Sequence, residues 1–139
     1  MAKFVCRHFK TNKILLQTKY VHDSIKCRCH PWYRDTGPQY DWVRILHANN
    51  QHVPARVMAV VPQECNGLET TFIVVQLASK KTGIRSTLFT EWSLDPTYVV
   101  IDADTISSMC FILNLDNSNT LIAECLDYKL WPQEFTHIA

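Results

Sequence analysis

The chain has 139 residues and a formal net charge of +1; 47% of its residues are hydrophobic and 19% are charged. This composition supplies a core of ordinary size for one domain and excludes disorder over most of the length. No run of about 18 apolar residues occurs, and the first residues form no apolar signal segment, so we expect neither a membrane span nor a secretory leader.

The first half of the chain alternates short apolar segments with turn residues. Residues 31–41 and Ala48–Gln51 are rich in turn formers, and a loop is expected over Pro62–Glu69, which contains Asn66-Gly67. The candidate strands between these turns are Lys13–Thr18, Tyr20–His22, Ser24–His30, Tyr40–Leu46 and Val53–Val61. In the fourth of them, Tyr40, Trp42, Arg44 and Leu46 share one face, while Val43 and Ile45 share the other. Trp42, beside Val43 and Ile45 in the sequence, is well placed to close an end of a barrel by packing.

The second half contains the strongest strand signal, the β-branched segment Thr70–Ala78. Lys80–Gly83 and Asp102–Thr105 read as turns, and Leu88–Leu94 fits either a short helix or a bent strand. Further strands are expected at Thr97–Asp102, Ser108–Asn114 and Thr120–Cys125, with Leu115–Thr120 as a hairpin loop and Tyr128–Phe135 packing across a barrel end.

Turn signals recur every eight to twelve residues or so, and no long amphipathic helix appears. This pattern predicts an all-β fold, a small barrel or sandwich with few or short helices. We place one domain over residues 1–139, in which residues 1–23 could form an extension.

The segment Cys29–Val43 reads Cys-His-Pro-Trp-Tyr-Arg-Asp-Thr-Gly-Pro-Gln-Tyr-Asp-Trp-Val. It resembles a signature of the C-terminal region of transposon-encoded proteins of the CACTA and Plavaka type, and the resemblance extends over residues 24–135. That region is similar in turn to the bromo-adjacent homology (BAH) domain. The shared order is Ala55–Val57, Phe72–Leu77, a Leu-Phe pair at residues 88–89, and Tyr98–Asp102 leading to Ile106. The resemblance implies a small distorted β-barrel (BAH-like) and a role in chromatin, in the nucleus.

The six cysteines are interpreted as reduced and mostly buried thiols. Cys27, Cys29 and His30 lie close together, but no second pair of ligands accompanies them, so whether they bind metal stays open. No nucleophile elbow, phosphate-binding glycine loop or His-Glu-x-x-His motif occurs. We therefore assign no catalytic residue, no metal and no cofactor, and expect a protein without enzymatic activity.

Charge is distributed unevenly, because residues 1–34 hold eight basic side chains against Asp23 alone. Such a basic region either contacts phosphate or lies beside the acidic part of the same fold or of a neighbour. The candidate nucleic-acid contacts are Lys26, Arg28, Arg34, Arg44, Lys80, Lys81 and Arg85.

Aromatic side chains gather in the same region. Rings beside carboxylates suit a methylated ammonium ligand, rings between arginines suit single-stranded nucleic acid, and packing explains them equally well. The candidate aromatic contacts are Trp32, Tyr33, Tyr40 and Trp92.

Two hypotheses about function follow. The first is a non-enzymatic chromatin- or nucleic-acid-binding module of a transposon-derived protein, with DNA or a nucleosome or histone as partner. The alternative is a structural domain for protein–protein interaction or self-association as a homodimer.

Overall fold

The structure is a computed structural model that describes residues 1–31, 37, 39–80, 90–114 and 120–125. The chain begins with one helix, α1 (Ala2–Phe9), followed by a sheet of three short strands, β1 (Lys19–His22), β2 (Ile25–His30) and β3 (Gln39–Tyr40). The other strands are β4 (Trp42–His47), β5 (Gln51–Cys65), β6 (Leu68–Lys80), β7 (Thr90–Asp102), β8 (Ile106–Asn114) and β9 (Thr120–Cys125). Short 3-10 turns, Ala48–Asn50 and Ala103–Thr105, join β4 to β5 and β7 to β8. The prediction of an all-β chain with few helices is confirmed.

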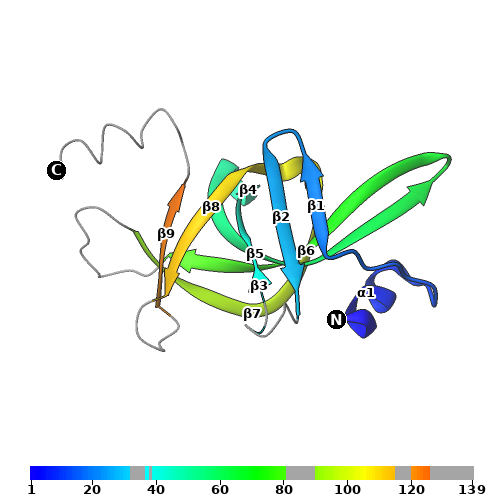
Figure 1. Cartoon of the computed structure of the whole chain (residues 1–139), viewed down its shortest axis with the longest axis horizontal. Helices are drawn as coiled ribbons and strands as arrows, with labels where there is room; N and C mark the ends of the chain where they lie inside the picture. Colours follow the sequence, from blue (N-terminus) through cyan, green and yellow to red (C-terminus); the bar gives the residue numbers. More distant parts are fainter. Residues whose placement is uncertain (32–36, 38, 81–89, 115–119, 126–139) are drawn as a thin grey trace.

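The last six strands pair in the order β4-β5-β6-β7-β9-β8, and β8 pairs again with β4, so that the hydrogen-bonded strands close into a ring (Figure 1). All neighbouring strands in this ring are antiparallel. β5 and β6 form its longest hairpin, whose tip extends beyond the other strands (Figure 1). The strand register shifts between Val57 and Ala59, which is the irregularity expected of a β-bulge in a strongly bent strand.

Two apolar clusters lie on opposite faces of β5, β6 and β7, because successive strand residues point to opposite sides. The first cluster joins Cys27 and Cys29 of β2 to core residues of the ring such as Val43, Val57 and Val75. The three-stranded sheet therefore covers one face of the ring strands.

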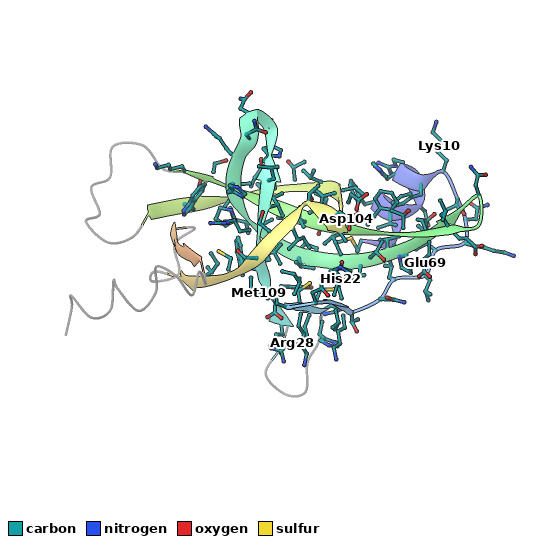
Figure 2. The ribbon with its side chains drawn as sticks, turned by 90° about the horizontal axis from the view of Figure 1, so that it is seen from above. Lys10, His22, Arg28, Glu69, Asp104 and Met109 are labelled. Carbon is teal, nitrogen blue, oxygen red and sulfur yellow. The ribbon has the colours of Figure 1, made fainter. Side chains whose placement is uncertain are left out.

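The second cluster is covered by α1. Val5 is fully buried against Ala59, Val61 and Val74, and Phe4 and Phe9 pack around it. α1 ends after Phe9, because the next residue, Lys10, has a left-handed backbone conformation (φ 53°) that caps the helix. Residues 1–9 thus form a layer of the packed structure on the face opposite the three-stranded sheet (Figure 2).

Several expected elements agree with the structure, and two do not. Lys13–Thr18 is not a strand, and only an isolated bridge between Gln17 and Val60 links this segment to the sheet. The loop expected over Pro62–Glu69 is a continuation of β5 and β6 around a tight turn, in which Asn66 and Gly67 adopt positive φ values of 54° and 78°. Pro62 is tolerated in β5 because it lies where the strand has no partner on its other edge among the described residues.

The two faces expected for Tyr40–Leu46 are confirmed in β4. Val43 and Ile45 are fully buried in the first cluster, and Trp42 lies on the opposite face of β4. The ambiguous segment over Leu88–Leu94 is part of β7 from Thr90 onward. The Leu115–Thr120 hairpin loop, apart from Thr120 in β9, and the Tyr128–Phe135 tail lie outside the described residues.

Candidate nucleic-acid interface

The outward face of the β1–β2 hairpin carries three basic side chains. Lys19 lies directly opposite Arg28, and Val21 lies opposite Lys26, so all four project from the same side of the two strands. The alternate residues Cys27 and Cys29 point the other way and are buried. Lys19, Lys26 and Arg28 are called the basic hairpin face below.

Among the described residues, only Arg28 of this face is paired with a carboxylate. Its backbone N–H and its side-chain Nε both donate to Asp41 Oδ2, at 2.9 and 3.3 Å. Lys19 and Lys26 are exposed, and neither forms an ion pair with a described residue. Asp41 offsets the repulsion that Arg28 would otherwise have with Lys19 directly opposite, so the two lysines are the charges of this face that an anion would contact.

Acidic residues lie beside this hairpin on its other side. A hollow of about 360 Å³ is lined by Tyr20, Val21 and His22 together with Glu69, Asp102 and Asp104 (Figure 2). Burial, followed by the charge of Asp104, raises the pKa of Tyr20. The basic first third therefore borders acidic residues of the same fold, as one interpretation of the sequence expected, while no described carboxylate pairs with Lys19 or Lys26.

The basic residues of α1 are separated from the basic hairpin face. Lys3 and Arg7 are exposed on the helix, and Lys10 follows it. Figure 2 shows Lys10 and Arg28 on opposite sides of the long strands. The basic residues of the first third that the structure describes thus do not form one continuous surface.

A cleft of about 670 Å³ lies at the end of the ring where the β4–β5 turn meets the ends of β6 and β7. Lys80 and Trp92 are directly opposite each other in the β6–β7 register and both line it. This hollow is called the Trp92 cleft below. Its remaining lining residues are His47, Gln51, His52, Val53, Leu77, Ala78, Ser79 and Asp95.

The Trp92 cleft has an apolar floor and a polar rim. Ala78 is buried, while Val53, Leu77 and Trp92 are half-buried; His47, His52, Lys80 and Asp95 are exposed. Ser107 Oγ lies 3.2 Å from His52 Nδ1 and fixes the orientation of the ring. Asp95 Oδ1 accepts a hydrogen bond from the Thr97 N–H at 2.9 Å. Clefts of this volume with a few polar groups around an apolar surface are typical of ligand sites.

Arg44 lies away from both regions, on the middle of β4. It faces Pro54 on one side and Ser108 on the other, and its Nε is buried without a hydrogen-bond partner, as is Ser108 Oγ. Nearby Arg56 donates from Nη2 to Gln76 Oε1 at 2.6 Å, and burial lowers its pKa. These arginines are embedded side chains rather than free surface cations.

Tyr40 is half-buried at the edge of the first cluster. Its ring packs against the first cluster, and the guanidinium carbon of Arg56 lies 5.5 Å from the ring centroid. Tyr40 is not among the residues that line the Trp92 cleft. Of the other sequence candidates, Trp32, Tyr33, Arg34, Lys81 and Arg85 lie outside the described residues.

The thiols of Cys6, Cys27, Cys29 and Cys110 are free, and the last three are buried as expected. Burial raises the pKa of Cys27 to about 12 and that of Cys29 to about 11. Cys29 Sγ donates to Gln17 O at 3.6 Å. Cys27 and Cys29 face the core while His30, next along β2, points to the other side, and within the described ranges no cluster of three metal-binding side chains is found.

Sequence reasoning omitted three residues that the structure adds to these regions: Lys19, His47 and His52. Lys19 could have been found, because a two-residue turn at Asp23-Ser24 between two predicted strands places it opposite Arg28. The two histidines flank the turn at Ala48–Asn50, but their proximity to Trp92 depends on the pairing of strands distant in sequence.

Among the described residues no helix is long and apolar enough to cross a membrane. Comparison with known proteins finds no matching family model, no similar curated protein and no similar solved structure.

Proposed function

We propose that this protein is a non-enzymatic module that binds nucleic acid through the basic hairpin face. The observation that carries the proposal is the projection of Lys19, Lys26 and Arg28 from one side of two paired strands, with neither lysine in an ion pair with a residue that the structure describes. Phosphate neutralisation by lysine and arginine supplies most of the affinity in sequence-independent nucleic-acid binding.

The setting of this activity follows from the sequence resemblance. The order of segments from Ala55–Val57 to Tyr98–Asp102 supports a BAH-like barrel, and the Cys29–Val43 segment supports an origin in a transposon-encoded protein. Chromatin is then the natural location of the ligand, and DNA, free or in a nucleosome, is its natural form. The nucleus is the expected compartment.

The test is the salt dependence of binding to a short fluorescein-labelled DNA duplex, measured by anisotropy between about 50 and 200 mM salt. If three phosphates are contacted, the slope of log K against log salt is about −2.7. Replacing both Lys19 and Lys26 by Gln should make the slope less steep by about 1.8 and lower affinity throughout.

The matched control is the replacement of Lys3 and Arg7 by Gln, which removes two basic side chains from the opposite side of the molecule. This variant has the same change in net charge, so it should retain the wild-type slope. Equal losses in both variants would mean that net charge alone attracts DNA, and an absence of binding at low salt would refute the proposal.

A second candidate function, self-association, is favoured by the tip of the β5–β6 hairpin. Leu68 is 73% exposed, and Leu15, on a neighbouring hollow, is 64% exposed. In the described ranges neither outer edge of this hairpin tip has a strand partner. Exposed strand edges pair readily with other chains. Sedimentation of wild type and Leu68→Lys tests it: a dimer that the substitution dissociates supports self-association, and a monomeric wild type excludes it.

A further inference from the structure

The Trp92 cleft is a separate site from the basic hairpin face, because the two share no residue. It combines an indole ring, a lysine and two histidines around an apolar floor. An indole face binds flat aromatic rings by stacking, and lysine and histidine side chains are donors to phosphate oxygens. The ligand that satisfies both features is a planar ring carrying an anionic group.

Resting on the proposed function, we infer that the Trp92 cleft accepts one unpaired nucleotide of a single strand. Its base stacks on Trp92, and its phosphate contacts Lys80, which lies directly across from Trp92 in the strand register. His52, whose ring is held by Ser107, adds a second polar group on the β5 side. A base inside a duplex is stacked on both faces and cannot enter the cleft, so this site distinguishes single strands from duplexes.

Asp95 gives the cleft a preference among bases. Its exposed carboxylate is on the rim, and Oδ1 accepts a hydrogen bond from the Thr97 N–H at 2.9 Å. A carboxylate accepts a hydrogen bond from an exocyclic amino group, which cytosine has and thymine lacks. Cytosine is therefore preferred over thymine at this position.

The test compares the binding of oligo-dC, oligo-dT and a DNA duplex to wild-type protein and to Trp92→Ala at one salt concentration. We expect Trp92→Ala to weaken oligo-dC binding by roughly five- to hundredfold and to leave duplex binding unchanged. Trp92→Phe, which keeps an aromatic face, should restore most of the affinity, and unchanged duplex binding by Trp92→Ala shows that its loss is not a failure to fold.

Asp95→Ala tests the base preference separately. Wild type should favour oligo-dC over oligo-dT by roughly tenfold, and the variant should bind both alike. Equal binding of wild type to single strands and duplex, unchanged in Trp92→Ala, overturns the inference about the cleft and leaves the basic hairpin face intact. A wild type that binds none of the three probes overturns the proposed function instead.

Discussion

Replacing Val5 by Ala tests whether the N-terminal helix is part of the folded core. The Val5 side chain is fully buried between α1 and the β5–β6 strands, against Ala59, Val61 and Val74. The substitution removes two methyl groups, whose transfer from water is worth about 0.8 kcal/mol each, and the small cavity that remains adds to the loss. We therefore expect the free energy of unfolding to fall by about 2 kcal/mol.

The assay is urea unfolding followed by tryptophan fluorescence, with circular dichroism as a second probe. The midpoint should fall while the slope with urea stays constant, since the surface exposed on unfolding hardly changes. In thermal unfolding the same loss corresponds to a decrease in Tm of about 6–8 °C for a chain of this size.

Lys3→Ala is the control, because Lys3 is an exposed position of the same helix. It should change stability by no more than about 0.5 kcal/mol. If Val5→Ala unfolds at the wild-type urea concentration, α1 does not pack on the sheet. A large loss in both variants would also contradict the reasoning, because Lys3 is exposed and alanine favours the helix at both positions.

Three further predictions follow from particular residues. Gly67→Ala should destabilise the protein by about 1 kcal/mol in urea, because Gly67 has a φ of 78° and open space around it, so that only backbone strain opposes the new side chain; an unchanged midpoint would contradict the tight turn at Asn66-Gly67. Arg44→Met should raise the unfolding free energy by about 1 kcal/mol, because the buried Nε of Arg44 has no partner and methionine fills similar volume; a less stable variant in the same assay would mean that Arg44 is solvated. Since burial holds the pKa of Cys27 at about 12 and that of Cys29 at about 11, above their usual value, both thiols stay protonated longer in the folded than in the unfolded chain. Their contribution to stability is complete below pH 9 and declines as pH rises from 9 through 11 to 12; the decline should be smaller in Cys27→Ala/Cys29→Ala, and an equal decline would place its origin elsewhere.

Local sequence determined the strands and several of their faces. Thr70–Ala78 is β-branched and apolar enough to form a buried strand wherever it is placed, and it forms most of β6. The alternation in Ser24–His30 set Cys27 and Cys29 on the core side of β2 and Lys26 and Arg28 on the other, because side-chain direction in a strand has a period of two. For the same reason, the sequence alone predicts that Lys26 and Arg28 project from the same side of this hairpin.

Tertiary structure decided what local pattern could not encode. Ala2–Phe9 is too short to be a stable helix alone, and it is helical here because its apolar side chains cover Ala59, Val61 and Val74. Trp42 and Val43 are both apolar, so only the docking of the three-stranded sheet on one face of β4 determines which of them is in the first cluster. The Trp92 cleft joins residues more than forty positions apart, His47 and Trp92, and such a site depends on the pairing of β4, β5, β6 and β7, which no short segment specifies.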